Sequence, residues 1–418
     1  MIDRGFCTMI MKNMRPAIPL LLLAALPAWG DAVSLSFNQH ATKNVFQTSD
    51  AVADQISVFS LAFDKDLSAL SLLGRAEYSA FHQTTGMSFF AAEAGLDYLV
   101  PASRKSAFYF AAGGTGEIYR QTYEAFNSLG ANLLGAFKTY LAPSSILKVQ
   151  WQGQYAAYKE SLFDFLSQTL SLSIDKYFPT RTTLKADAGW GYKYFLHPFL
   201  PEPAEPAAVM ALMSGGGAGT GDRGTGSGGS RAGGGYQYQG GHGFIPRYSS
   251  EGGGAGIGHV SLSLLAAQGL GDAVGLSVSG LRQWVVSGES PFMSIEEFYY
   301  VQNPTSDSFS WEGYQLNGRI TLELPWDLSL KTGYTYSDKS YPGVESMSSE
   351  GVPLGVTRSD RQNLIEARLQ KDFRRLAVFL SYSYVDNTST DPLFVWSSPF
   401  LMAGIEWHLP TGRKGGVS

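Results

Sequence analysis

The feature that most constrains this chain is a strict two-residue alternation of apolar and polar side chains. Between positions 313 and 324 the even positions are apolar or small, and the odd ones include Gln315, Arg319 and Glu323. After a short turn the same period returns between 328 and 340. Successive side chains of a β-strand point to opposite faces, so this stretch predicts a hairpin with one apolar and one charged face.

The same alternation recurs from one end of the chain to the other. We expect about sixteen strands, within a range of about 14–18, as an even-numbered barrel requires. The predicted strands are 33–46, 54–64, 69–82, 87–100, 105–119, 127–141, 145–158, 163–177, 181–196, 258–270, 272–287, 311–324, 328–340, 358–373, 375–388 and 398–409.

The connections between these segments are sorted by length. A tight turn follows every even-numbered strand, whereas long polar loops follow the later odd-numbered ones, at about 197–257, 288–310, 341–357 and 389–397. A soluble sandwich has no reason to sort its loops in this way, but a transmembrane barrel has short turns on one side and long loops on the other. Closure pairs every backbone group, so one face meets lipid and the other a wet lumen. The sequence predicts an all-β fold, a closed antiparallel up-and-down transmembrane β-barrel.

Composition excludes several other classes. The chain has 418 residues, of which 16 % are charged and 13 % aromatic, and its formal net charge is −5. After residue 30 no apolar run reaches the length of about 18 residues that a membrane-crossing helix needs. No cluster of Lys and Arg is present, so we expect no nucleic-acid partner.

Residues 1–30 have the pattern of a signal peptide. Lys12 and Arg15 precede the apolar core "AIPLLLLAALPAWG", which ends in a small-x-small cleavage site before Asp31. The single cysteine, Cys7, lies before this core. The mature chain is therefore expected to lack disulfides, thiol catalysis and cysteine metal sites. Secretion to the periplasm is the expected first step.

The C-terminal motif Gly404-Ile405-Glu406-Trp407-His408-Leu409 resembles the last-strand assembly signal of bacterial outer-membrane β-barrel, porin-like proteins. The resemblance rests on Gly404, Trp407 and Leu409, and it implies outer-membrane localisation, with membrane lipid and the barrel-assembly machinery as partners. The chain departs from that pattern by continuing through a tail, 410–418.

The final strands are also similar to the barrels of surface-lipoprotein assembly modifiers. The shared features are an Arg/Asp pair before a strand and the pattern Tyr-x-Tyr-x-x-Asn-x-Ser after it, within "RSDRQNLIEARLQKDFRRLAVFLSYSYVDNTS". No helical repeat domain precedes the barrel here, so that family's function is not carried over.

A glycine-rich insert, 201–257, interrupts the strand pattern. Of the 48 glycines, 20 lie between positions 215 and 258. Such a composition buries too little apolar surface to offset chain entropy, so disorder is expected in this fifth external loop. Two roles remain open, a flexible surface tether and a loop that folds back into the pore. The Gly-x-Gly-x-x-Gly match at Gly219, Gly221 and Gly224 lacks the strand–helix context of a nucleotide site.

The sequence contains no recognisable active site, and we expect no enzyme activity, cofactor or metal. Two pairs, His82 near Ser79 and His408 near Glu406, could be considered as hydrolase residues. We interpret each of them as lumen or rim residues. The candidate functional residues are instead charges on the predicted lumen face, where they would form a constriction. They are Arg75, Glu77, Glu93, Asp97, Lys148, Lys185, Asp187, Arg319, Glu323, Lys331, Glu366 and Arg368.

These observations predict one barrel domain, 31–409, acting as a passive channel for small polar solutes. Sixteen strands leave an aqueous channel unless something fills it. The main alternative is a structural or export barrel that presents or passes a protein partner through the glycine-rich loop. An outer-membrane hydrolase ranks below both.

Overall fold

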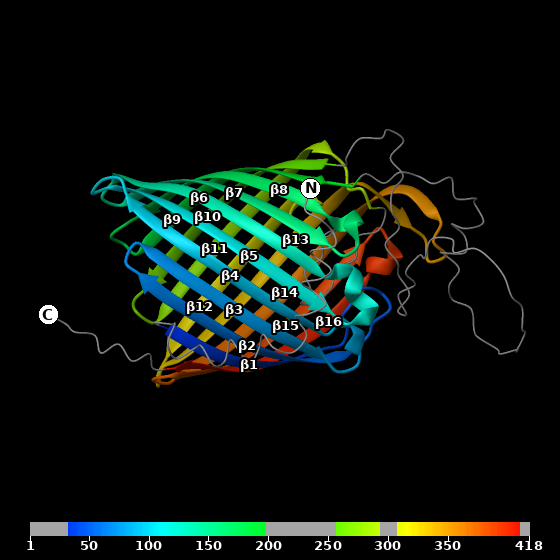
Figure 1. Cartoon of the computed structure of the whole chain (residues 1–418), viewed down its shortest axis with the longest axis horizontal. Helices are drawn as coiled ribbons and strands as arrows, with labels where there is room; N and C mark the ends of the chain where they lie inside the picture. The colour runs from blue at the N-terminus through cyan, green and yellow to red at the C-terminus, as the bar shows by residue number, and fades with distance from the viewer. Residues whose placement is uncertain (1–31, 198–255, 293–306, 410–418) are drawn as a thin grey trace, which may run out of the picture.

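The computed structural model describes residues 32–197, 256–292 and 307–409, and these form a closed antiparallel barrel of sixteen strands (Figure 1). The strands are β1 Ala32–Thr42, β2 Asp54–Leu67, β3 Leu70–Phe81, β4 Phe89–Pro101, β5 Ser106–Tyr119, β6 Ser128–Ala142, β7 Ser145–Tyr158, β8 Phe165–Tyr177, β9 Thr182–Phe195, β10 Gly256–Leu270, β11 Val274–Gly288, β12 Glu312–Leu324, β13 Leu328–Met347, β14 Pro353–Asp372, β15 Leu376–Ser389 and β16 Trp396–Leu409. The predicted fold and strand number are confirmed.

Each strand pairs with its neighbours in sequence, and the first strand closes the ring on the last. β1 pairs with β2 on one side and with β16 on the other, in a register that runs from Val33 opposite Leu409 to Thr42 opposite Phe400. Because the ring is closed, it has no open edge whose backbone groups would remain unpaired in lipid.

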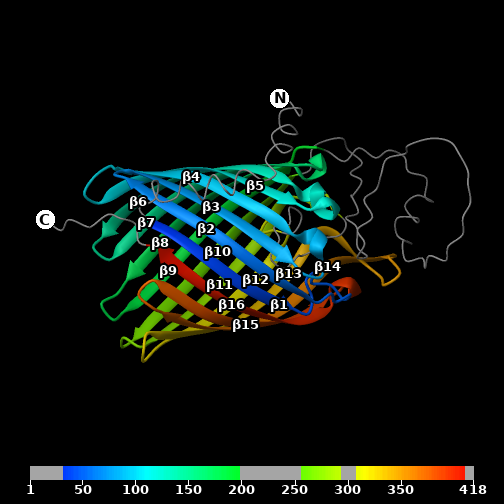
Figure 2. The same ribbon diagram turned by 60° about the horizontal axis from the view of Figure 1, so that its bottom comes forward.

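The connections are sorted between the two ends of the barrel, as the sequence predicted. We call one end the tight-turn end, where the connections are 68–69, 102–105, 143–144, 178–181, 271–273, 325–327 and 373–375. At the opposite loop end lie four 3-10 helices: η1 Thr85–Met87, η2 Gln121–Phe126, η3 Ser161–Phe163 and η4 Pro392–Phe394. Figure 2 shows these helices gathered at one end and the tight turns at the other.

The prediction of a long loop over 341–357 is wrong. β13 and β14 continue outward as a hairpin, which leaves only 348–352 as the connection. The pairing shifts register between Ser340 and Glu345. Because of this irregularity, the two-residue alternation stops at about position 340, before the strand itself ends. The hairpin extends beyond the rest of the loop end (Figure 1). β10 likewise begins at Gly256, two positions inside the predicted insert.

The outer surface of the barrel is an apolar belt. Large apolar side chains on the outward face of the strands are exposed, such as Val278 at 64 %, Leu316 at 53 % and Ile320 at 44 %. Trp326, which is 81 % exposed, lies in a turn at the tight-turn end. An exposed apolar surface around a closed, even-numbered barrel with sorted connections is that of a bacterial outer-membrane-type β-barrel in contact with lipid.

Among the described residues, no helix has both the length and the apolar character needed to cross a membrane.

The predicted signal peptide (1–30), most of the glycine-rich insert and the C-terminal tail (410–418) lie outside the described residues. The nucleotide-like glycine match lies outside them as well.

Candidate functional site

The inner wall of the barrel is polar, and the twelve charged candidates lie on it. Arg319 alternates with outward-facing Ile320, and Lys148 alternates with outward-facing Val149. Every other member of the set likewise occupies the strand face opposite the apolar belt, as the pairing registers show. The side chains of Arg75, Lys148, Arg319 and Lys331 are solvent-exposed although they point inward. The midsection of the lumen is therefore accessible to water.

Half of these charges form three local ion pairs. Arg75 Nη2 lies 2.7 Å from Glu77 Oε2, and Lys185 Nζ lies 2.9 Å from Asp187 Oδ1. Arg319 Nη2 lies 3.0 Å from Glu366 Oε1 of β14. The arginine partners are about half exposed, so these pairs orient side chains around water more than they stabilise the fold.

At two other places on the wall, a basic residue has another basic residue, and not an acidic one, directly opposite it on the neighbouring strand. Lys331 of β13 stands opposite Arg368 of β14, and Lys138 of β6 stands opposite Lys148 of β7. Like charges placed directly across a ladder repel each other. Arg368 also lies with its guanidinium carbon 3.8 Å from the centre of the Phe379 ring. Both basic pairs lie in the half of the lumen nearer the tight-turn end, where they would attract anions.

At the loop end the inner face changes from polar to apolar, and side chains fill part of the lumen. We call this set the mouth core. It joins the inward-facing ends of β2–β5 and β7–β9 with the three helices η1, η2 and η3. Its buried members are Val45, Ile56, Val58, Phe81, Met87, Phe89, Tyr119, Tyr123, Phe126, Ala156, Phe163, Phe165, Phe195 and Phe292. The loop end is therefore narrower than the wall of sixteen strands alone implies.

A buried ion pair lies against the mouth core. The side chain of Lys193 is 2 % exposed and its Nζ donates to Asp307 Oδ2, from the connection between β11 and β12. The same ammonium lies 4.2 Å from the ring centre of Phe165 and 4.8 Å from that of Phe195. Aromatic faces and a carboxylate together replace the water that this charge loses.

Both described arms of the β11–β12 connection attach to the inner wall. On the leaving side, the Phe292 ring lies 5.5 Å from the Phe195 ring and 5.8 Å from the Phe163 ring, centre to centre. On the return side, Gln283 Nε2 donates to the carbonyls of Ser308 and Trp311, each at 2.6 Å. The described arms of this connection, 289–292 and 307–311, therefore lie inside the mouth and contribute to its narrowing.

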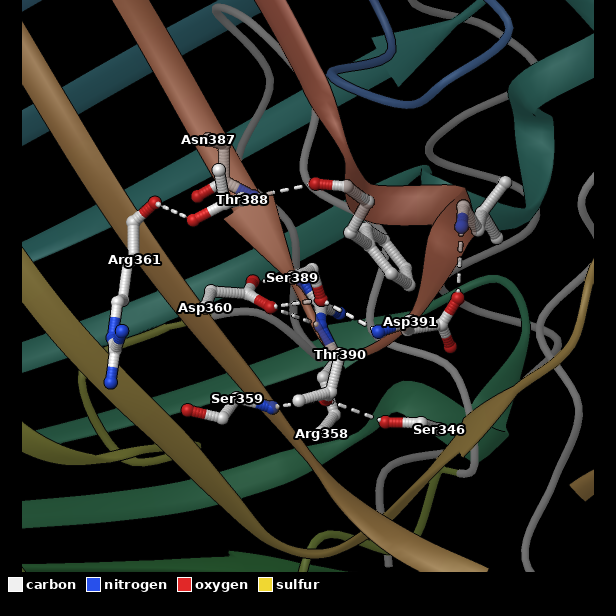
Figure 3. Close-up of polar contacts among 12 residues, drawn as sticks. Ser346, Arg358, Ser359, Asp360, Arg361, Asn387, Thr388, Ser389, Thr390 and Asp391 are labelled. Atoms are coloured by element: carbon white, nitrogen blue, oxygen red, sulfur yellow. Dashed lines mark hydrogen bonds and ion pairs between the residues drawn. The ribbon is translucent and has the colours of Figure 1, made fainter. Parts of the chain in front are cut away.

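A second buried charge occupies the loop end of β14. Arg358 is 1 % exposed and makes a two-pronged pair with Asp360, at 3.1 Å from Nε and 2.5 Å from Nη2. Its guanidinium carbon lies 3.3 Å from the ring centre of Phe394 and 4.5 Å from that of Tyr341. Asp360 also accepts a hydrogen bond from Ser389 Oγ at 2.6 Å (Figure 3).

Neighbouring contacts join the projecting hairpin to the β15–β16 connection. Asp391 accepts hydrogen bonds from the backbone N–H of Met347 and of Leu393, each at 3.0 Å. The hydroxyls of Ser346 and Thr390 lie 2.8 Å apart (Figure 3). These contacts attach the hairpin to the β15–β16 connection at the rim of the loop end.

The residues of the expected assembly signal lie in the strand that closes the barrel. Trp407 is half exposed on the lipid face, and Leu409 pairs with Val33 of β1. Gly404 faces inward, where a Cβ atom would approach Asn38 Oδ1 to 2.1 Å, so the close packing requires glycine. Recognition by the assembly machinery stays a proposal.

The two histidine pairs named from the sequence have different outcomes. His408 Nε2 lies 3.8 Å from Glu406 Oε1, and both side chains are exposed. His82 does not face Ser79, which is buried on the lumen side and donates to Glu77. His82 instead contacts Ser57 on the outer face. Within the described residues no three His, Cys, Asp or Glu side chains are grouped as a metal site.

Neither the mouth core nor the burial of Lys193 and Arg358 was identified from the sequence. One feature of the sequence could have indicated the mouth core. The inward-facing positions of several strands turn apolar only next to the loop end, as at Ile56 and Val58 near the start of β2 and at Phe165, the first residue of β8.

No family model and no curated protein matches the chain. Solved structures of similar shape include OccK3 (OpdO) of Pseudomonas aeruginosa, at 9 % identity, 90 % coverage of this chain and 95 % of that one, with a TM-score of 0.46. OccAB1 of Acinetobacter baumannii gives 6 % identity, 90 % and 95 % coverage and a TM-score of 0.49. A bacterial polysaccharide outer membrane secretin gives 7 %, 91 %, 99 % and 0.47. None of these likenesses assigns a solute.

Proposed function

We propose that the protein is a passive outer-membrane channel for small polar solutes. The observation that supports this proposal is the inner wall of the closed barrel, where solvent-exposed charges such as Arg75, Lys148 and Arg319 line the midsection. A wall of sixteen strands leaves an aqueous path unless side chains or loops fill it. Here filling is observed at the loop end, in the mouth core and around Arg358. The mouth, rather than the midsection, sets the size limit for solutes.

Conductance in a planar bilayer tests this proposal. The refolded mature chain should produce discrete steps of current, and vesicles containing it should swell in solutions of small sugars but not of large ones. A chain that folds and inserts without conducting ions or admitting sugars would show that the mouth is sealed, and the channel proposal would then fail.

The unneutralised basic pair should influence ion selectivity. Replacing Lys331 and Arg368 together with glutamine should move the reversal potential in a salt gradient toward cation preference, because these two charges face each other across the ladder. Glu93→Gln, on the facing wall of β4, serves as the matched control and should shift the potential in the opposite direction. Equal potentials in all three proteins would place the selective constriction elsewhere.

The glycine-rich insert is expected to face the outside of the cell. The strands on either side of it, β9 and β10, meet it at Phe195 and Gly256, both at the loop end. Protease added to intact cells should therefore cut within 205–255 and leave two large barrel fragments. Cutting only after lysis would show that the barrel has the opposite orientation in the membrane.

A second candidate function, presentation or passage of a protein partner, is favoured by the projecting hairpin. Its tip exposes Val352 at 57 %, Leu354 at 45 % and Val356 at 48 %. Exposed apolar residues on a hairpin that stands outside the belt are typical of an interaction surface. Removing the tip should abolish partner capture and leave conductance unchanged if both functions exist.

A further inference from the structure

Three polar residues on the outer face of β1–β3 form a compact hydrogen-bonded group. His82 Nε2 lies 2.8 Å from Ser57 Oγ, and Gln39 Oε1 lies 2.7 Å from the same oxygen. A serine hydroxyl within hydrogen-bond distance of an imidazole is the arrangement that activates serine for attack on a carbonyl. The channel proposed above does not use this group, because it lies outside the lumen.

The pairing registers place this group at the loop-end margin of the apolar belt. Gln39 stands opposite Ser57, and in the next outward-facing row Phe37 stands opposite Phe59, which is 53 % exposed. Below the group the surface is apolar, and beyond it the chain enters loops. This is the level at which the headgroup region of a bilayer meets its hydrocarbon core, where the ester bonds of lipids lie.

An apolar groove of about 420 Å³ begins directly beneath the group and continues along the belt. Phe37, Phe59 and Tyr78 line its upper part, and Trp407 of β16 lines it further toward the tight-turn end. Lipid surrounds this face of the barrel, so the molecule at hand to fill the groove is an acyl chain. A chain seated there would place its ester end beside Ser57.

The backbone at His82 is held by the strand that carries the serine. Asp54 Oδ1, in β2, accepts hydrogen bonds from the backbone N–H of His82 at 3.0 Å and of Gln83 at 2.9 Å. The His82 N–H also donates to the carbonyl of Gln55 at 3.0 Å. Asp54 is thus a positioning residue, since it holds the backbone of His82 next to Ser57.

A cation lies on the same margin. Arg120, just beyond β5, is exposed, and its Nη2 lies 3.5 Å from the hydroxyl of Tyr78. Tyr78 itself lines the groove. An arginine at headgroup level is suited to a phosphate group, which it binds through paired N–H donors.

From this geometry we propose that Ser57 and His82 are the catalytic residues of an esterase that acts on acyl esters of membrane phospholipids. Ser57 Oγ bonds to the ester carbonyl carbon while its proton passes to His82 Nε2. The carbon–oxygen bond to the alcohol then breaks, and the alcohol leaves with that proton. Water, reaching the exposed side of His82, gives its proton to Nε2 and its oxygen to the acyl carbon. Ser57 regains the proton as the fatty acid departs.

The hydrogen bonds observed fit this cycle with one rotation. With the His82 proton on Nδ1, the Ser57 hydroxyl donates to Nε2, and the Gln39 carboxamide turned by half a rotation offers its NH2 to the reacting oxygen. Ser57 is 9 % exposed, and Gln39, which covers it, is half-buried. Turning Gln39 therefore both opens the serine and supplies a donor for the developing negative charge.

The test uses the full chain purified from membranes and a biotin-linked fluorophosphonate, which reacts with activated serines. Mass spectrometry should find the phosphonate on Ser57, and Ser57→Ala should remove all labelling. In mixed micelles of detergent and phosphatidylcholine, His82→Asn should lower fatty-acid release by about 100- to 10,000-fold, the usual contribution of a general base. Ser71→Ala, on the lumen face of the neighbouring strand β3 and outside the groove, is the matched control and should keep both signals.

A second variant separates the groove from the catalytic pair. Ala76 lines the groove, so Ala76→Trp should block release from long-chain phosphatidylcholine while hydrolysis of water-soluble p-nitrophenyl butyrate continues. Circular dichroism confirms folding of each variant. An unlabelled Ser57 in the folded protein, or fatty-acid release that persists in Ser57→Ala, would reduce the group to a structural hydrogen bond and overturn the proposal.

Discussion

Replacing Asp307 with asparagine should lower the free energy of unfolding by about 3–5 kcal/mol, the cost of breaking a buried ion pair by removing one partner. Lys193, whose side chain is 2 % exposed, would lose the carboxylate that pairs with it beside the rings of Phe165 and Phe195. Cation–π attraction recovers only part of the lost pairing. Urea unfolding of the protein in lipid vesicles measures the difference.

An exposed pair of the same chemical type gives the matched control. Arg361 Nε lies 3.1 Å from Asp338 Oδ2, but the arginine side chain is 69 % exposed, so Asp338→Asn should cost less than about 1 kcal/mol. Adding Lys193→Met to Asp307→Asn should restore most of the stability, because the buried charge is then gone. Similar losses for Asp307→Asn and Asp338→Asn would contradict the packing of the mouth.

The same substitution also bears on the channel. Asp307 joins the return arm of the β11–β12 connection to β9. If the stability loss is relieved by release of this arm, single-channel recordings should show larger or more frequent current steps than in the native protein. The Lys193→Met, Asp307→Asn double variant should return toward native conductance, since the apolar side chain still fills the mouth core.

The barrel was predictable from sequence because the membrane imposes two requirements on every strand. Each must pair all its backbone groups, and each must present one face to lipid and one to water. These requirements produce the period of two that predicted a strand over 145–158, with the same bounds as β7, Ser145–Tyr158. They also assign Ile320 to the lipid face and Arg319 to the lumen face, although the two residues are adjacent in the chain.

The mouth was beyond sequence reasoning because its contacts join residues far apart in the chain. Lys193 and Asp307 are separated by 114 positions, and no local pattern links them. The apolar residues at the loop end of the inward-facing positions, such as Ile56 and Phe165, can be seen in the sequence. Their partners across the lumen depend on how the loops fold inward. The prediction of a wet lumen was therefore incomplete at the loop end.

The outer group was missed for a related reason. Ser57 and His82 are 25 positions apart, and sequence proximity pointed to Ser79 instead. Ser79 faces the lumen, whereas His82, the first residue after β3, faces outward. A histidine's neighbour in a barrel is decided by register across strands, which the sequence pattern does not specify to one residue.

The outer face of β12 is expected to meet hydrocarbon near the middle of the membrane. Ile320 is 44 % exposed on the outer face of β12, between Tyr314 toward the loop end and Trp326 at the tight-turn end. Ile320→Arg should cost about 2–4 kcal/mol of barrel stability, because hydrocarbon near the membrane midplane does not solvate a guanidinium. Urea unfolding in vesicles measures this cost as well.

Two lumen substitutions on the same strand calibrate that value. Arg319→Gln should cost less than about 1 kcal/mol, because the pair with Glu366 is exposed to water in the lumen. Asn317→Arg adds the same side chain as Ile320→Arg on the opposite face, and it loses only a 2.7 Å hydrogen bond to Thr335, worth about 0.5–1.5 kcal/mol. If arginine at 317 destabilised the barrel as much as arginine at 320, the outer face of β12 would not meet hydrocarbon, since only a difference in solvation separates the two sites.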